Sequence, residues 1–241
     1  MKITQLVAKL SEYHISDAEA ALVRLILRSG EVDSVKNGVV QKIASRFNKN
    51  VGGVEHFILE QKIEPTLALL EKFYELRVEG EDRKINGAYF TPPEIVSYIA
   101  KETIQGVGTI CDPACGSGAF LVEAARLLKK KTRLPYAQIF SKLLYGVDIL
   151  PANINHVRLI LSLLAVTEGE DQKDFTFNIY IGDALVFNWD KKISNFRGFD
   201  YIVGNPPYVR TKNLRVDVRE NIKKWNTGNF ANTDLYIPFF E

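Results

Sequence analysis

Hydrophobic residues in the first third of the chain recur every three or four positions, a spacing that places them on one face of a helix. Ser16 and Glu19 have the three-residue spacing of a capping box ahead of the first periodic segment, and Gly30 ends that segment. Gly52-Gly53 interrupts the pattern again. We therefore expect a small all-helical region over residues 1–80. The segments with helical spacing are 20–27, 34–47, 54–63 and 66–76.

The hydrophobic pattern changes after the charged, glycine-bounded stretch EGEDRKING (residues 79–87), which we interpret as a linker. Short apolar runs then alternate with helical patterns, and this alternation is typical of an α/β domain with a parallel sheet. We expect a Rossmann-like, doubly wound and mostly parallel sheet in a domain over residues 81–241. The expected strands are 108–111, 143–148, 175–181 and 199–204, and the expected helices are 118–131 and 151–166.

The composition is ordinary for a globular protein, since 46% of the 241 residues are hydrophobic and 25% are charged. No apolar run reaches membrane-spanning length and no signal segment is evident, so we expect a cytoplasmic protein. The two cysteines, Cys111 and Cys115, share one loop, which argues against a disulfide-built fold and favours packing roles. The scattered histidines lack zinc-ligand spacing. A net charge of +2 is too small to indicate nucleic acid binding by itself, so any basic surface that binds nucleic acid must be a local cluster.

Polar residues follow all four expected strands. In a doubly wound sheet, ligands bind where the carboxyl ends of the strands meet the following loops. The first loop, DPACGSGAF (Asp112–Phe120), is rich in glycine and opens a helix, but it lacks the lysine of a Walker loop and the third glycine of a dinucleotide motif. From these residues alone, a cofactor-binding loop and a purely structural turn are both open.

The other three strand ends also carry candidate chemistry. Asp148 stands where a carboxylate binds ribose hydroxyls in dinucleotide folds, although it can equally cap the helix starting at Pro151. Asp183 could accept a hydrogen bond from an adenine amine, with the N–H of Ala184 facing a ring nitrogen, and the alternative is an aspartate in a turn. GNPPY (Gly204–Tyr208) ends the fourth strand, because two prolines prevent a strand or helix from continuing.

A further motif, YFTPPE, precedes the first strand. Thr91 and Glu94 form a second capping box, with Pro92 at the first helical position. We expect a helix to start here, and its N-terminal N–H groups could also meet a ligand carboxylate.

Together, these motifs resemble those of the amino-methylating DNA methyltransferases that use S-adenosylmethionine, specifically the adenine-N6 enzymes of restriction–modification systems. The resemblance covers about residues 88–241, and several motifs in the same order are more specific than any one of them. It implies a methyltransferase fold, S-adenosylmethionine as cofactor and double-stranded DNA as substrate. The motifs are YFTPPE, DPACGSGAF, GVDI, GDA, NPPY and DLYIPFFE (Asp234–Glu241).

The resemblance also implies a role for each cofactor contact. Phe90, Thr91 and the glycine loop would hold the methionine end, and Asp148 would bind the ribose hydroxyls. Ile149 and Phe239 would pack on the adenine ring, whose edge Asp183 and Ala184 would recognise. The complete implied set is Phe90, Thr91, Asp112, Ala114, Cys115, Gly116, Gly118, Phe120, Asp148, Ile149, Asp183, Ala184, Asn205 and Phe239.

For catalysis, the resemblance implies that the side-chain oxygen of Asn205 and the carbonyl of Pro206 accept the two hydrogens of the target amine. Pro206 and Pro207 would hold the carbonyl direction and place no competing N–H donor there. Tyr208 would stack on a base swung out of the duplex. No strong general base is required, and none is evident.

Two basic clusters flank these motifs. The first cluster follows NPPY directly, and we expect it to contact DNA phosphates, with Arg210, Lys212 and Arg215 as the leading candidates. Its other members are Arg219, Lys223 and Lys224. For the second cluster, Lys129–Lys131 with Arg133, we favour a solvated helix face.

Several questions stay open at this stage. Because no helix stop precedes Glu241, we expect this chain to be the catalytic portion of a longer monomeric protein that continues with further strands and a target-recognition domain, alongside a cognate restriction activity. One alternative is a methyltransferase acting on a protein glutamine or an RNA base. The other is a non-catalytic subunit that binds the cofactor or DNA. Residues 1–80 carry no interpretable motif.

Overall fold

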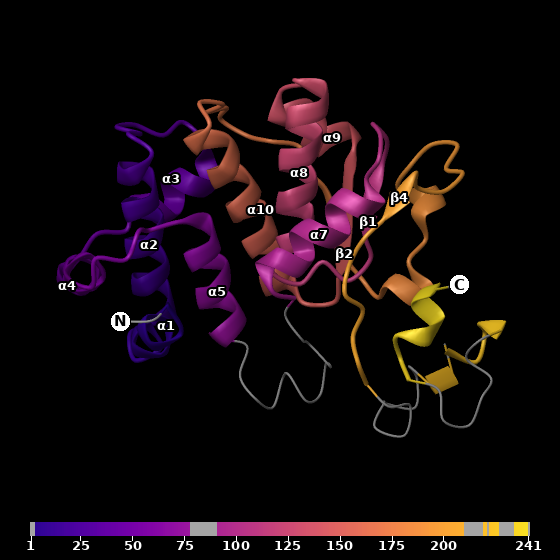
Figure 1. Ribbon diagram of the computed structural model, residues 1–241, viewed down its shortest axis with the longest axis horizontal. Helices are drawn as coiled ribbons and strands as arrows, with labels where there is room; N and C mark the ends of the chain where they lie inside the picture. Colours follow the sequence, from indigo (N-terminus) through magenta and orange to yellow (C-terminus); the bar gives the residue numbers. More distant parts are fainter. Residues whose placement is uncertain (1–2, 78–90, 210–218, 221, 227–233, 241) are drawn as a thin grey trace.

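The computed structural model describes residues 3–77, 91–209, 219–220, 222–226 and 234–240. The expected all-helical character of the N-terminal part is confirmed over its described residues. Its helices form one end of the molecule (Figure 1, indigo to purple). The expected linker at 79–87 lies outside the described residues. The helices are α1 (Ile3–Leu10), α2 (Ile15–Ser29), α3 (Gly38–Ala44), α4 (Lys49–Glu60) and α5 (Leu67–Arg77).

The ends of α2 are set partly by residues that the pattern did not predict. Gly30 is the C-cap, as expected, but the N-cap is His14, whose imidazole accepts the backbone N–H of Ser16. The capping box of Ser16 and Glu19 is therefore wrong, because both residues already lie inside the helix. The Glu19 carboxylate instead accepts a hydrogen bond from the hydroxyl of Tyr74 on α5.

The break expected at Gly52-Gly53 is also wrong, because both glycines lie within α4. A glycine inside a helix costs about 1 kcal/mol relative to alanine. The neighbouring Val51, Val54 and Ile58 are fully buried, and α4 packs along α2. This tertiary packing outweighs the poor helix propensity.

The second part of the chain forms the expected parallel sheet, with strand order β3-β2-β1-β4. The expected strands and both expected helices are present, and the strands are shorter than predicted. One helix between α8 and β2, α9, was not predicted. The elements are α7 (Pro93–Thr103), β1 (Ile110–Asp112), α8 (Ala119–Thr132), α9 (Tyr136–Lys142), β2 (Leu144–Asp148), α10 (Pro151–Thr167), β3 (Asn178–Ile181) and β4 (Tyr201–Ile202).

The two faces of the sheet are covered differently. Successive crossovers from β1 to β2 and from β2 to β3 place α8 and α10 on one face, where α7 packs on α8. The other face carries Tyr145 and Tyr180, which contact Trp189 and Phe199. Trp189 and Phe199 belong to the segment that connects β3 to β4, and β4 pairs with the side of β1 opposite to β2. Successive strands are therefore added in one direction from β1 to β3, and β4 is added on the opposite side of β1. The boundary between β1 and β4 is the switch point where doubly wound sheets bind ligands.

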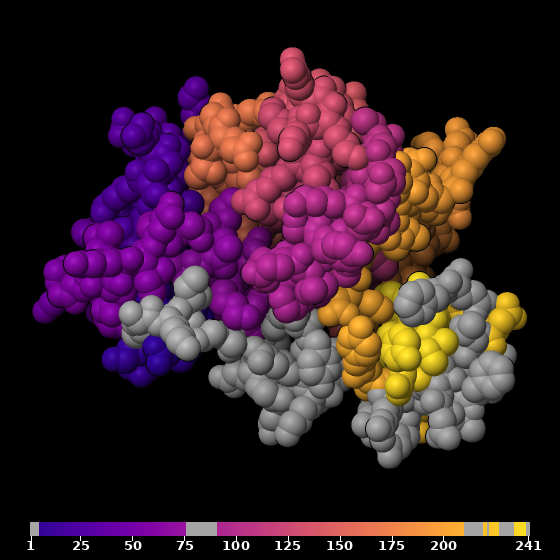
Figure 2. Space-filling model, viewed as in Figure 1, coloured from indigo at the N-terminus to yellow at the C-terminus, as the bar shows by residue number. Residues whose placement is uncertain are grey.

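The helical region and the sheet region share one hydrophobic core. Helices α2, α3 and α5 contact α10, and the two parts adjoin in the space-filling view (Figure 2). Asn37, which is completely buried, donates its side-chain amide to the carbonyl of Gln172 at 3.0 Å. Its backbone N–H and that of Lys36 bond the carboxylate of Asp171 at 2.8 and 2.6 Å. Within the described residues, no helix is long and apolar enough to cross a membrane.

Candidate functional site

Two backbone hydrogen bonds and one bond to a carboxylate tie the ends of β1, β2 and β3 together. The N–H of Cys115, in the loop after β1, bonds the carbonyl of Val147 at 3.0 Å. The next residue, Gly116, donates its N–H to Oδ2 of Asp148 at 2.9 Å. On the other side, the N–H of Gly182 bonds the carbonyl of Asp148 at 3.0 Å. Asp148 is therefore the centre of a junction between three of the sequence-predicted loops.

The fourth loop meets the first on the other side of β1. Val203 donates its N–H to the carbonyl of Cys111 at 3.0 Å, which holds β4 against β1. Gly204 then lies directly against the carboxylate of Asp112, since a Cβ on this glycine would stand 2.5 Å from Asp112 Oδ1. The first residue of GNPPY thus touches the first residue of the glycine loop.

The glycine loop itself needs two of its glycines. Gly116 and Gly118 have φ values of +49° and +91°, a region that residues with a Cβ rarely adopt. A Cβ on Gly118 would also stand 3.0 Å from Val157 of α10. Gly118 is the N-cap of α8, so the loop brings the positive end of a helix to the site.

Asp112 is the most strongly perturbed acid of the site. Its side chain is buried, with 1% of the residue exposed, and Oδ1 accepts the N–H of Ala114 at 3.1 Å. Burial raises the pKa of Asp112 to about 7, the bond from Ala114 opposes this, and the nearby charge of Asp148 raises it further. A buried carboxylate of this kind is suited to a cationic ligand, which would restore its charge.

Asp148 accepts hydrogen bonds on both carboxylate oxygens. Oδ1 accepts the N–H of Leu150 at 2.9 Å and the side-chain amide of Asn153 at 3.0 Å, while Oδ2 accepts Gly116. Burial raises the pKa of Asp148, and these three bonds oppose the increase. The alternative prediction, that Asp148 is the N-cap of α10, is wrong in detail, because the N-cap is Leu150. Its carboxylate nevertheless organises the turn that leads into the helix.

At the end of β3, Oδ1 of Asp183 accepts the N–H of Leu185 at 3.0 Å and caps the 3₁₀-helix η1 (Ala184–Val186). The turn interpretation of Asp183 is therefore confirmed, and contact with an adenine edge stays a prediction. Ile149, beside Asp148, exposes 52% of its surface. An exposed isoleucine at a strand end offers an apolar surface for a flat ring.

Four of the implied cofactor contacts are buried, namely Asp112, Cys115, Gly118 and Phe120. Phe120 and Cys115 are each 4% exposed and pack in the core, so a ligand would meet their backbone rather than their side chains. Burial also raises the pKa of both cysteine thiols, Cys111 and Cys115. The packing role expected for the cysteines agrees with this, since a thiol with a raised pKa is a poor nucleophile.

Tyr208 is half-exposed, and its ring lies 5.4 Å from that of Tyr236. Next to it, the carbonyl of Val209 accepts the N–H of Leu235 at 2.8 Å, which brings the DLYIPFFE segment beside NPPY. Phe239 lies in the 3₁₀-helix η5 (Ile237–Phe240) of that segment, and its contact with the cofactor stays a prediction.

The start of α7 differs from the expected capping box. The helix begins at Pro93, and its N-cap is Pro92, which makes no side-chain cap. The carbonyl of Pro92 instead accepts the N–H groups of Ile95 and Val96 at 2.9 and 3.0 Å. The predicted capping box formed by Thr91 and Glu94 is therefore wrong. Thr91 is the first described residue after the gap, and Phe90 lies outside the described residues.

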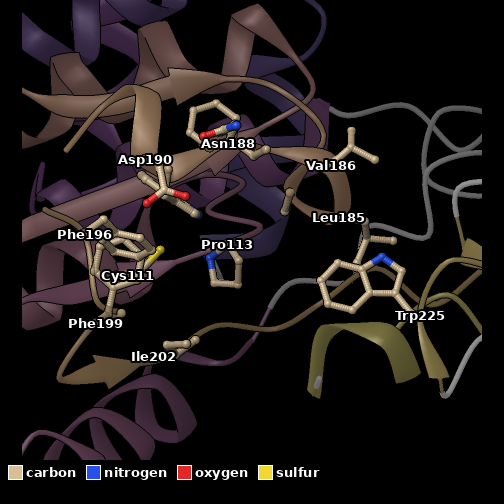
Figure 3. Close-up of a pocket in the computed structure, with 14 residues that line it drawn as sticks. Cys111, Pro113, Leu185, Val186, Asn188, Asp190, Phe196, Phe199, Ile202 and Trp225 are labelled. Atoms are coloured by element: carbon tan, nitrogen blue, oxygen red, sulfur yellow. The ribbon is translucent and has the colours of Figure 1, made fainter. Parts of the chain in front are cut away.

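A cavity of about 620 Å³ adjoins these loops on the aromatic face of the sheet (Figure 3). Pro113 and Ala184 connect it with the first and third loops, but sequence reasoning missed its other walls. Most of them come from the β3–β4 connection, whose aromatic residues had no regular period that could have identified them, and the rest are Cys111 in β1, Ile202 in β4 and Trp225. The lining residues are Cys111, Pro113, Ala184, Leu185, Val186, Phe187, Asn188, Trp189, Asp190, Phe196, Gly198, Phe199, Ile202 and Trp225.

Two members of the second basic cluster, Lys129 and Lys131, form bonds within the protein. Lys129 forms an ion pair with Glu170, and its Nζ also donates to the carbonyl of Leu134 at 3.2 Å. Lys131 donates to the carbonyl of Ile104 at 2.6 Å. These two side chains therefore fasten the end of α8. Lys130, Lys131 and Arg133 are exposed, as expected of a solvated helix face. The cluster of Arg210, Lys212 and Arg215 lies outside the described residues. Within the described ranges, no group of acidic, histidine and cysteine side chains could hold a metal ion.

Comparison with known proteins places these motifs in a family. The model of the N-6 DNA methylase family matches residues 69–236, more than half of the 241 residues. The type II methyltransferase M.BstVI of Geobacillus stearothermophilus is 28% identical over 66% of this chain and 31% of its own length. The methylase subunit of the type I restriction enzyme MpnII of Mycoplasma pneumoniae is 32% identical over 56% of this chain and 25% of its own. The chain thus spans less than a third of these relatives.

Solved structures confirm the Rossmann-like fold. The DrdV–DNA complex has a TM-score of 0.56 at 17% identity, and the match covers 99% of this chain and 31% of that one. A putative class I S-adenosylmethionine-dependent methyltransferase from Listeria monocytogenes has a TM-score of 0.51 at 18% identity, over 93% of this chain and 68% of that one.

Proposed function

Because the chain belongs to the N-6 DNA methylase family, we propose that it is the cofactor-binding and catalytic core of a DNA methyltransferase. Its reaction is transfer of a methyl group from S-adenosylmethionine to N6 of adenine, within a restriction–modification system. The observation that carries the proposal is the contact between Gly204 and Asp112. This contact brings the start of the proposed catalytic loop, GNPPY (Gly204–Tyr208), against the glycine loop at the switch point of the sheet.

S-adenosylmethionine, when bound, supplies an electrophilic methyl group on a positively charged sulfur. The site fits such a ligand because it offers two partly desolvated carboxylates, Asp112 and Asp148, and a helix N-terminus. Asp112 and the glycine loop would attract the cationic methionine end, with Phe90 and Thr91 beside them. Asp148 would accept the ribose hydroxyls.

The chain's own catalytic contribution is to orient the target amine. The lone pair of adenine N6 is delocalised into the ring, which makes the nitrogen a poor nucleophile. Asn205 and the carbonyl of Pro206 accept both amine hydrogens, so the lone pair can turn out of the ring plane. The acceptors are held in place before the reaction, which is the condition for electrostatic catalysis. Tyr208, half-exposed, stacks on the flipped base, a contact worth about 1–3 kcal/mol.

Double-stranded DNA is the proposed partner. M.BstVI is named a type II methyltransferase, and one structural neighbour is a DNA complex. Arg210, Lys212 and Arg215 directly follow the base-stacking Tyr208 in sequence, where phosphate contacts would hold the duplex. A target-recognition domain and a cognate restriction activity complete the proposed system.

The direct test is transfer of a labelled methyl group by the full-length protein. We expect methylation of duplex DNA at adenine N6, and loss of at least about 100-fold in rate when Asn205→Ala removes one preorganised acceptor. Asn155→Ala, a change of the same kind at an exposed position of α10, serves as the control and should keep most of the activity. Methylation of an RNA or of a protein glutamine, with unmodified DNA, would contradict the proposal. So would full activity of the Asn205→Ala variant.

A further inference from the structure

The side chain of Asn153 lies immediately behind Asp148. Asn153 is in the first turn of α10, where its backbone N–H bonds the carbonyl of Leu150 at 3.1 Å. Its side-chain Nδ2 donates to Oδ1 of Asp148 at 3.0 Å. No motif of the sequence contains Asn153, and five positions separate it from the aspartate.

The hydrogen bonds of Asp148 leave it one direction for a ligand. A carboxylate has about four acceptor positions, two on each oxygen. Leu150 and Asn153 fill both positions on Oδ1, and Gly116 fills one on Oδ2. The remaining position is on Oδ2, the oxygen that faces the glycine loop.

Of the two donors to Oδ1, only Asn153 can fix the rotation of the carboxylate independently of the local turn. The N–H of Leu150 belongs to the same short turn as Asp148, two residues away, and moves with it. Asn153 is held by α10, whose buried side chains anchor it in the core. Its amide therefore ties the carboxylate to a rigid element, and a side chain fixed in this way loses less entropy when a ligand binds.

We propose that Asn153 is a positioning residue of the cofactor site, acting through Asp148. Its amide holds Oδ1 and thereby directs Oδ2 at the glycine loop and at the ribose of the ligand. This inference rests on the proposed function, because it assumes that Asp148 binds the ribose of S-adenosylmethionine.

A double-mutant cycle tests the inference by calorimetric titration with S-adenosylmethionine. We expect Asn153→Ala to raise the Kd about five- to tenfold, since a bond to a charged group is lost. In the Asp148→Ala background the same change should add nothing, because the residue through which it acts is gone. Asn155→Ala, two positions further along α10 at an exposed position, is the matched control and should leave the Kd unchanged.

Each other outcome has a distinct meaning. An unchanged Kd for Asn153→Ala, or a loss that persists in the Asp148→Ala background, overturns the positioning role and leaves the cofactor site standing. An unchanged Kd for Asp148→Ala overturns the proposed role of Asp148, and with it this inference.

A second variant covers the case in which Asn153→Ala does not fold. Asn153→Asp keeps the size of the side chain and places a carboxylate in the first turn of a helix, where it is tolerated. Loss of the amide donor and repulsion between the two carboxylates should then raise the Kd above that of the parent protein, and this increase should vanish in the Asp148→Ala background. An unchanged Kd for Asn153→Asp, or an increase that persists in the Asp148→Ala background, would overturn the proposal.

Discussion

Replacing Gly204 by alanine tests the contact between the catalytic loop and the cofactor loop. The added Cβ would stand 2.5 Å from Oδ1 and 3.1 Å from Cγ of Asp112. Real Cβ atoms essentially never approach a heavy atom this closely, so one of the two loops must move. The carboxylate cannot simply rotate away, because it is buried and Oδ1 holds the N–H of Ala114 at 3.1 Å.

The cost has two parts. Overpacking a well-packed site costs about 1–3 kcal/mol, which for a protein of this size lowers Tm by about 2–12 °C. Displacement of Asp112 also removes the acceptor of a backbone N–H and the carboxylate proposed to attract the methionine end of the cofactor. We therefore expect Gly204→Ala to lower Tm and to weaken S-adenosylmethionine binding about tenfold or more.

Thermal unfolding and calorimetric titration of the same preparation measure the two effects. Gly53→Ala is the control, since Gly53 lies inside α4 and a Cβ there would meet nothing within 4 Å. That change should stabilise the protein by about 0.5–1 kcal/mol and leave the affinity alone. If Gly204→Ala keeps the parent Tm and affinity, the two loops do not touch and the proposed geometry of the site is wrong.

Three further predictions concern charged and titratable side chains. Cofactor binding should weaken as pH falls below about 7, because the pKa of Asp112 is raised to about 7 and protonation neutralises its carboxylate. Asp112→Asn should remove this pH dependence, as measured by titrations with the cofactor at pH 6 and pH 8. His156 is buried without a hydrogen-bond partner for either ring nitrogen, and burial lowers its pKa to about 3. The folded state therefore excludes a proton that the unfolded chain binds below about pH 6.5, so stability is lost as pH falls from about 6.5 to 3, and His156→Phe should flatten this loss in acid-unfolding curves. The double variant Arg210→Ala with Lys212→Ala should make DNA binding less dependent on salt. The control Lys129→Ala should lower Tm and leave the slope of log K against log salt unchanged. An unchanged slope in the double variant would show that residues 210–212 do not contact DNA phosphates.

The sequence predicted the elements whose patterns are local. The strands around Cys111 and Tyr145 are short apolar runs between polar residues, and their ends could be placed because glycine, aspartate and proline follow them. The meeting of the four loops also followed from sequence, since parallel strands expose their carboxyl ends at one edge of a sheet.

What escaped prediction depends on tertiary contacts. Gly52 and Gly53 favour a helix end by propensity, yet the packing of α4 on α2 keeps them helical. A histidine as N-cap, as at His14, has no strong sequence signal. Helix α9 is too short for a clear period. The bond from Asn153 to Asp148 depends on how a loop turns into a helix, which spacing alone does not reveal.

We propose that the loops after the four strands form one S-adenosylmethionine site centred on Asp148. Calorimetric titration of the chain with S-adenosylmethionine, in parallel with Asp148→Ala, tests it most directly. We expect one binding site per chain and at least tenfold weaker binding in the variant, whose Tm also falls because Gly116, Leu150 and Asn153 lose their acceptor. Absence of binding, or equal affinity in the two proteins, would contradict it.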